Sequence, residues 1–137
     1  MTEDKRIASG GKDGNISISS YDLTKKRWKI DIHKEEAHYK WINSLCTLNG
    51  NRLLSGGEDR SIKVWSLSDV KLTLTKEIKA HTLVVHKIIP LSKERFASCS
   101  SDGKVRIWKD DNTYECISTS QHDDSAISIL QLKERKC

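Results

Sequence analysis

The chain has 137 residues, a length that ordinarily corresponds to one domain, with 36% hydrophobic residues, 31% charged residues and a net charge of +5. No run of eighteen apolar residues occurs, which excludes a membrane-spanning helix, and the first residues lack the apolar core of a signal peptide. The four cysteines have no close pairing, so we interpret them as reduced thiols. We therefore expect a cytoplasmic protein without membrane partners, with a nuclear location as the alternative.

A run of seventeen residues occurs three times. The copies span residues 6–22, 52–68 and 95–111. Each copy carries an aspartate at its eighth position: Asp13, Asp59 and Asp102. The aspartates are separated by 46 and 43 residues, and a fixed period of this size is typical of architectures in which each unit stacks on its neighbours.

Alternation of apolar and polar residues predicts strands in each period. The first period covers 6–32. The second contains four expected strands, separated by tight turns: 42–48, 52–55, 61–65 and 71–78. The third repeats this pattern: 85–91, 95–100, 104–108 and 114–119. No segment has helical periodicity, so the predicted fold class is all-β, with three four-stranded antiparallel repeats in one region covering 1–137.

Four side chains of different chemistry recur at the same offsets in the last two periods. They are His38, Ser55, Asp59 and Trp65, and then His81, Ser98, Asp102 and Trp108. A buried carboxylate must be hydrogen-bonded. We expect Asp59 to accept from backbone amides and from the His38 ring. We expect the ring to contact Ser55, whose hydroxyl reaches the Trp65 indole, and such a satisfied network would rigidify a small sheet.

This constellation resembles the WD-repeat (WD40) β-propeller family, and the resemblance spans the whole sequence. It implies that each repeat is a four-stranded blade in which these side chains form a structural hydrogen-bonded chain. The first copy retains Ser9 and Asp13, has Ser19 at the tryptophan position, and lacks the histidine. His122 opens a further copy. The chain departs from the family where Gly-His is expected, which reads Ala37-His38, Ala80-His81 and Gln121-His122.

The phases of the repeats predict an incomplete first blade. Residues 1–5 align with 47–51, and 126–132 align with the first strands of the other blades. The expected blades are residues 6–32 plus a donated strand, residues 38–78, residues 81–119, and a surplus first strand within 122–132. We expect half of a six-bladed propeller, whose first blade is completed by residues 126–132 of another chain in a homodimer. The alternative is a fragment of a longer WD-repeat protein of about seven blades.

The motifs argue against catalysis. A Ser-His-Asp triad is disfavoured because the set occurs twice and no Gly-x-Ser-x-Gly elbow is present. No Cys-x-x-Cys pair supports zinc, and Gly10-Gly-Lys12 lacks the remainder of a phosphate-binding loop. We therefore predict no enzymatic activity, no cofactor and no metal.

The resemblance implies a partner-binding face around the central channel, formed near the start of each innermost strand and just before each turn aspartate. The residues at these positions are Trp41, Asn43, Val84, His86, Ser125, Ile127, Lys12, Glu58 and Ser101. Trp41 is the sharpest candidate, since binding hot spots are enriched in tryptophan, although it would alternatively pack against a neighbouring blade. We predict a non-catalytic scaffold for proteins or peptides. The basic charge leaves a nucleic-acid or chromatin binder as a less favoured alternative, because acidic residues interrupt most basic runs.

Overall fold

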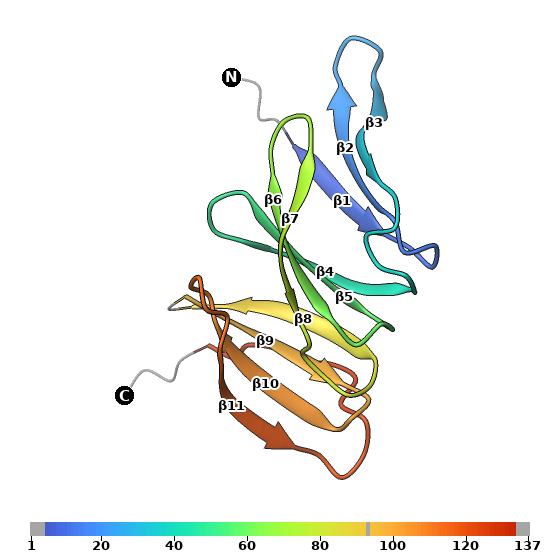
Figure 1. Cartoon of the computed structure of the whole chain (residues 1–137). Coiled ribbons are helices and arrows are strands. Elements are labelled where there is room, and N and C mark those ends of the chain that lie inside the picture. Colours follow the sequence, from blue (N-terminus) through green and yellow to red (C-terminus); the bar gives the residue numbers. More distant parts are fainter. Residues whose placement is uncertain (1–4, 93, 134–137) are drawn as a thin grey trace.

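The computed structural model describes residues 5–92 and 94–133, and every regular element within them is a β-strand. The strands form three separate antiparallel sheets that follow one another along the chain (Figure 1). This arrangement confirms the all-β prediction. We refer to the three sheets as blades 1, 2 and 3 in chain order.

The strands of each blade pair in sequence order. Blade 1 has three strands: β1 (Arg6–Gly10), β2 (Ile16–Asp22) and β3 (Arg27–Lys34). Blade 2 has four: β4 (Ile42–Leu48), β5 (Arg52–Gly57), β6 (Ile62–Leu67) and β7 (Leu72–Ile78). Blade 3 has four: β8 (Val85–Leu91), β9 (Arg95–Ser100), β10 (Lys104–Lys109) and β11 (Cys116–Gln121). Consecutive strands are joined by tight turns, as the repeat predicts.

Three strands differ from the sequence prediction by two residues: β5 and β6 extend to Gly57 and Leu67, past the expected ends at 55 and 65, and the last strand of blade 3 is shifted. The last strand of blade 3 was expected over 114–119, and β11 instead runs over Cys116–Gln121. The Asp111 carboxylate accepts hydrogen bonds from the backbone amides of Thr113 and Tyr114, at 2.8 and 3.3 Å. Tyr114 has a φ of 51°, outside the strand region. The side-chain turn of Asp111 therefore delays the strand by two residues.

The core lies between blades and not within any one of them. The interface of blades 1 and 2 buries Ile16, Ile18, Ile32, Ala37, Ile42, Leu53, Trp65 and Leu72. The interface of blades 2 and 3 buries Leu54, Ile62, Val64, Ile78, Ala80, Val85, Ile88, Phe96 and Trp108. Blade 2 is thus covered on both faces. The outer face of blade 1 has no covering sheet among the described residues, and there Ile7, Trp28 and Ile30 are 52%, 49% and 64% exposed.

The crossings between blades share one backbone pattern. The amide of His38 donates to the carbonyl of Gly14 at 2.9 Å, and the amide of His81 donates to the carbonyl of Arg60 at 3.3 Å. Gly14 has a φ of 77°, and a Cβ there would lie 2.0 Å from the His38 carbonyl oxygen. Glycine is therefore required at this position of the β1–β2 turn, against which the crossing from blade 1 to blade 2 packs.

The segment after β11 begins a third crossing of the same kind. The amide of His122 donates to the carbonyl of Gly103 at 2.7 Å. The amide of Ala126 donates to the carbonyl of Ser100 at 2.9 Å, as the amide of Ile42 does to Gly11 at 3.0 Å. Residues 126–132 are not a strand within the single chain, because none of the described strands pairs with them. That they form one with a second chain stays a prediction.

A charged clamp also joins blades 2 and 3. Both terminal nitrogens of Arg52 donate to the Asp110 carboxylate, at 2.5 and 3.1 Å, and one of them also reaches the Tyr114 hydroxyl at 3.2 Å. The Asp110 side chain is only 5% exposed, and its hydrogen bond to Arg52 raises the pKa of the guanidinium. Such two-pronged charged contacts are the stronger class of protein hydrogen bond.

We predict that Arg52→Met lowers the free energy of unfolding by about 1–2 kcal/mol, because Asp110 is left buried without its partner. Chemical denaturation of both proteins measures the difference. Lys79→Met is the matched control, since the Lys79–Glu77 pair is exposed, and exposed pairs contribute little. Equal losses in the two variants would contradict a specific role for the clamp.

Candidate functional site

Blade 2 contains a connected set of buried polar side chains. The His38 ring contacts the Asp59 carboxylate through Nδ1 at 2.5 Å and the Ser55 hydroxyl through Nε2 at 2.6 Å. The Trp65 indole donates to the same hydroxyl at 2.8 Å. His38, Ser55 and Trp65 are each at most 1% exposed. The set links the loop before β4 to strands β5 and β6, and so fixes the blade internally.

Blade 3 repeats this set with its own residues. The His81 ring lies 3.0 Å from the Asp102 carboxylate and 2.7 Å from the Ser98 hydroxyl, which accepts from the Trp108 indole at 3.0 Å. Burial lowers the pKa of His81, and the Asp102 carboxylate opposes this without reversing it. Burial of the Asp102 carboxyl is outweighed by hydrogen bonds from the Lys104 and Thr82 amides and from His81, which lower its pKa.

The third set predicted from the sequence is not assembled within one chain. Ser9 and the turn residue Asp13 are exposed on blade 1, where the Asp13 carboxylate accepts a hydrogen bond from the Asn15 backbone amide at 3.0 Å. Ser19 occupies the tryptophan position of this blade. His122 is exposed at the far side of blade 3, and no hydrogen bond joins its ring to Ser9 or Asp13 in the described chain.

The geometry of the complete sets is structural in character. The Ser55 hydroxyl is 0% exposed and is already contacted by both the His38 ring and the Trp65 indole. An attacking serine must reach a substrate carbonyl, so this arrangement suits a structural hydrogen-bond network and not a nucleophile. Within residues 5–92 and 94–133, no group of three or more histidine, cysteine or acidic side chains is placed to hold a metal ion.

Trp41 and its neighbours define the first part of the predicted partner-binding face. The Lys12 ammonium lies 4.3 Å from the centroid of the Trp41 ring, and this tryptophan is 44% exposed. The Glu58 amide donates to the Trp41 carbonyl at 2.9 Å. Trp41 therefore presents part of its ring to solvent from a backbone that is tied to the turn of blade 2.

The corresponding residues of blade 3 are joined in the same way. The Ser101 amide donates to the Val84 carbonyl at 3.0 Å, and the Ser101 hydroxyl lies 2.6 Å from the His86 ring. The Ser125 hydroxyl donates to the Ser101 carbonyl at 3.3 Å, and Ile127 is 68% exposed. Asn43 connects blades 2 and 3, because its side-chain Nδ2–H donates to the Val85 backbone carbonyl at 3.2 Å. We call the nine predicted positions the rim; contacts within it join Trp41 to Lys12 and Glu58, and Ser101 to Val84, His86 and Ser125.

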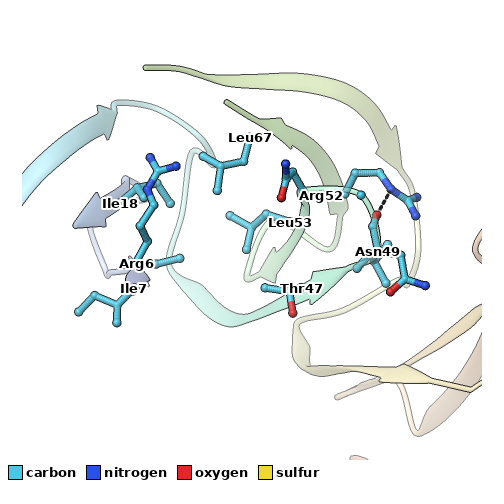
Figure 2. Close-up of a pocket in the computed structure, with 12 residues that line it drawn as sticks. Arg6, Ile7, Ile18, Thr47, Asn49, Arg52, Leu53 and Leu67 are labelled. Carbon is cyan, nitrogen blue, oxygen red and sulfur yellow. Dashed lines mark hydrogen bonds between the residues drawn. The ribbon is translucent and has the colours of Figure 1, made fainter. Parts of the chain in front are cut away.

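A pocket of about 390 Å³ opens between blades 1 and 2 (Figure 2). Arg6, Ile7 and Ala8 of β1 line one side. The turn between β4 and β5 lines the other side. Figure 2 shows the Leu53 and Leu67 side chains directed into the space beside Ile18, with the Arg52 Nε–H donating to the Asn49 carbonyl at the rim, at 2.8 Å. The walls are therefore mainly apolar, with arginines at the margins.

The pocket and the arginine clamp were not among the sequence predictions. One signal for the clamp was present, since each of the three copies begins with an arginine: Arg6, Arg52 and Arg95. The Arg6 guanidinium, like that of Arg52, reaches across to the next blade, where it donates to the Ser68 carbonyl at 3.2 Å. The pocket has no local signal, because it depends on which strand lies beside β1.

Together, blades of antiparallel strands with a buried His-Ser-Asp-Trp set define a β-propeller-type repeat protein. The family model described as "WD domain, G-beta repeat" (WD40) matches residues 30–66 and 72–109, and the chain belongs to this family. No helix in the described ranges is long and apolar enough to cross a membrane.

Several curated proteins resemble the chain. Elongator complex protein 2 of Drosophila melanogaster is 28% identical over 70% of this chain and 13% of its own length. A probable cytosolic Fe-S cluster assembly factor of Schizosaccharomyces japonicus is 35% identical over 52% of this chain and 12% of its own. WD repeat-containing protein 55 of Danio rerio is 26% identical over 93% of this chain and 33% of its own. The chain therefore spans a third or less of these relatives.

We predict that His38→Ala lowers the free energy of unfolding by about 2–4 kcal/mol, because Asp59 and Ser55 lose their shared partner inside the blade. Trp65→Phe keeps most of the buried area and removes one indole donor, so its cost is about 1 kcal/mol. Urea denaturation monitored by circular dichroism measures both. A smaller loss for His38→Ala than for Trp65→Phe would contradict the central position of the histidine.

We also predict that acidification destabilises blade 3 in two steps. In the unfolded chain His81 has its ordinary pKa of 6.5, whereas burial in the folded protein lowers the pKa of this histidine. Stability is therefore full above pH 6.5 and falls as the pH drops through the lowered pKa of His81. A second loss begins below pH 3.8, the ordinary pKa of an aspartate, because the pKa of Asp102 is lowered in the fold; the lowered pKa of Asp59 produces the same loss in blade 2.

Melting temperatures between pH 7.5 and 5 measure the first step. The variant His81→Gln should be less stable at pH 7.5 but should show a flatter pH dependence than the wild type. His33→Gln, at an exposed histidine that contacts Ser17, should retain the wild-type profile. If the melting temperature of His81→Gln depended on pH as steeply as that of the wild type, the loss of stability would arise from another group.

Proposed function

We propose that this chain is a non-catalytic scaffold whose rim around Trp41 binds proteins or peptides. The observation that carries the proposal is the half-exposed Trp41 ring, which is held by Lys12 at 4.3 Å and by the backbone contact with Glu58. A large aromatic surface in a fixed position costs little conformational entropy on binding. Two further exposed apolar side chains lie next to rim positions in the sequence: Tyr39, two residues before Trp41, and Leu83, beside Val84, at 77% and 45% exposure.

The charge of the rim indicates the type of segment that fits. Lys12 and Lys40 lie over the Trp41 and Tyr39 rings, at 4.3 and 5.9 Å from the ring centroids. A partner segment that combines an apolar side chain with carboxylates would satisfy both the rings and the ammonium groups. One relative is named as a component of the Elongator complex, which is consistent with a role in assemblies.

We place this activity in the cytoplasm or the nucleus. The sequence supports this with four cysteines that have no close pairing, and the structure describes Cys46, Cys99 and Cys116 as free thiols. Burial raises the pKa of Cys46 to about 12, so this thiol stays protonated. A relative whose name includes the word cytosolic supports the cytoplasm.

We predict that Trp41→Ala weakens capture of partner proteins at least about tenfold. Tagged wild-type and variant chains are incubated with the same extract, and bound proteins are quantified by mass spectrometry. Val70→Ala is the control, because Val70 is 81% exposed on the turn between β6 and β7, away from the rim. Retention of the same partners by Trp41→Ala, at equal amounts, would contradict the proposed rim.

The assembly proposed for this scaffold is a homodimer that forms a six-bladed propeller. In each copy, residues 126–132 pair with the free edge of β1 in the other copy. Two observations support it: β1 has no strand on its second edge among the described residues, and residues 127–132 make no backbone hydrogen bond with the rest of the described chain. Unpaired edges attract further strands, and mutual exchange satisfies both of them.

A second candidate is supported by the comparisons. Because the chain spans a third or less of the relatives described above, the missing blades would come from further residues of a longer, approximately seven-bladed protein. Light scattering on the 137-residue chain distinguishes the two. The homodimer predicts a mass of twice 15.6 kDa. A mass of 15.6 kDa at every concentration would contradict the homodimer and favour the longer protein.

A further inference from the structure

The exposed segment after β11 is complementary to blade 1 in two ways. Its leucines match the apolar pocket between blades 1 and 2, and its backbone matches the free edge of β1. We propose that blade 1 is a receptor for residues 122–132 of a second copy. In this complex Leu130 and Leu132 fill the pocket, and His122 completes a hydrogen-bonded set with Ser9 and Asp13. The inference rests on the proposed homodimer and assigns its anchor residues.

The repeat sets the register of the donated strand. In blade 2, Cys46 lies opposite Leu54 and Leu48 lies opposite Arg52. Blade 3 has the same pairing one period later, with Ile89 opposite Ala97. Leu130 stands one further period along the chain, at the position of Cys46 and Ile89.

Applied to blade 1, this register gives two cross-strand pairs. Leu130 lies opposite Ala8, and Leu132 lies opposite Arg6. In an antiparallel pair, opposite residues project from the same face of the sheet. Ala8 lies opposite Ile18, which is buried against blade 2, so Arg6 and Ala8 project toward blade 2 and the two leucines would face the pocket on that side.

The completed interface of blades 2 and 3 shows what the pocket lacks. There, Cys46 and Leu48 of the innermost strand are packed against the apolar core that contains Leu54 and Phe96. No described residue fills the equivalent positions beside blade 1, where the space of about 390 Å³ lies. In the single chain Leu130 and Leu132 are each 80% exposed. Their transfer into the pocket would remove apolar surface from water on both sides.

The histidine contacts follow from how each crossing is built. The His38 backbone is bound to blade 1 through Gly14, while its ring reaches the Asp59 and Ser55 side chains of blade 2. Each histidine therefore connects the blade it leaves to the blade it enters. The His122 backbone is bound to blade 3 through Gly103. Its ring would consequently reach the aspartate and serine of the next blade in the ring.

The next blade in a two-copy ring is blade 1 of the second copy. This blade retains the serine and the turn aspartate, Ser9 and Asp13, and both are exposed in the single chain. No histidine precedes them within the described residues. Blade 1 therefore has two members of the hydrogen-bonded set, and the segment after β11 carries the third.

A charged contact supports the same pairing. Arg6 donates to carbonyls in the turn after β6, and Arg52 pairs with Asp110 at the start of the turn after β10. Arg95 is the third arginine of this series and is exposed on blade 3. On blade 1 of a second copy, Tyr21 stands at the position of Asp110, and Asp22 stands at the position of Ser68, whose carbonyl accepts from Arg6. Arg95 of one copy would thus reach the end of β2 in the other.

The test combines an altered donor with a free peptide. The chain variant Leu130→Asp/Leu132→Asp keeps its receptor blade and loses its anchors. We expect light scattering to show this variant as a monomer. A labelled peptide of residues 121–133 should bind it, as measured by fluorescence anisotropy, and a peptide that carries both aspartates should bind at least about a hundredfold more weakly. Val70→Asp, at an equally exposed position, should remain a dimer.

The histidine contacts are tested with the same assay. The peptide substitution His122→Ala should weaken binding about tenfold on the receptor with Asp13, and should have no further effect on a receptor with Asp13→Asn. If His122→Ala weakened peptide binding equally on both receptors, the proposed contact between His122 and Asp13 would be overturned.

The outcomes separate the two proposals. A monomeric wild-type chain would overturn both of them. A wild-type dimer that persists in the Leu130→Asp/Leu132→Asp variant would overturn the anchor assignment alone. Circular dichroism shows whether the monomeric variant keeps its β structure. If it unfolds, the peptide should restore the β signal in proportion to its binding, and failure to restore it would count against the receptor.

Discussion

The whole structure depends on the burial of sheet faces against neighbouring sheets. A sheet one layer thick has two faces, and neither can form a core by itself. Blade 2 is the complete case, since Trp65 is buried toward blade 1 and Leu54 toward blade 3, at 1% and 0% exposure. Blades 1 and 3 each have one described neighbour. Most of the hydrophobic stabilisation is therefore created between blades, and a blade without a neighbour exposes residues such as Ile30.

Two kinds of interaction stabilise this architecture, one between blades and one within each blade. Apolar contacts hold one blade against the next, while the polar sets of His38 and His81 hold the strands of a single blade together. The two are coupled at each crossing. The ring of the histidine binds the blade that the chain enters, and its backbone amide donates to a carbonyl of the blade before it. The arginines at the start of β1 and β5 add a polar contact across the same interfaces.

The sequence contained enough information to predict the repeat, the antiparallel strands and the composition of the polar sets. These features are local or recur at fixed offsets, as His38 and His81 do relative to their serines. The start of β11 was less predictable, because the Asp111 side chain competes with strand pairing through its own hydrogen bonds.

The pocket was beyond sequence reasoning, since it depends on contacts between residues from different blades. Ile18 and Leu53 are separated by one blade crossing, and no local pattern shows that the space between them is unfilled. The same limit applies to partners. The sequence indicated Trp41 as a candidate, and the structure adds how its ring is held, by Lys12, and how much of it is exposed.

The central claim is that residues 127–132 become a paired strand in a second copy. Amide hydrogen exchange of the 137-residue chain tests it most directly, since these amides make no backbone hydrogen bond within the described chain. The account predicts strong protection of this segment at high protein concentration and loss of protection on dilution, with matching changes in β1. Rapid exchange of the segment at every concentration, with blades 2 and 3 still protected, would contradict it.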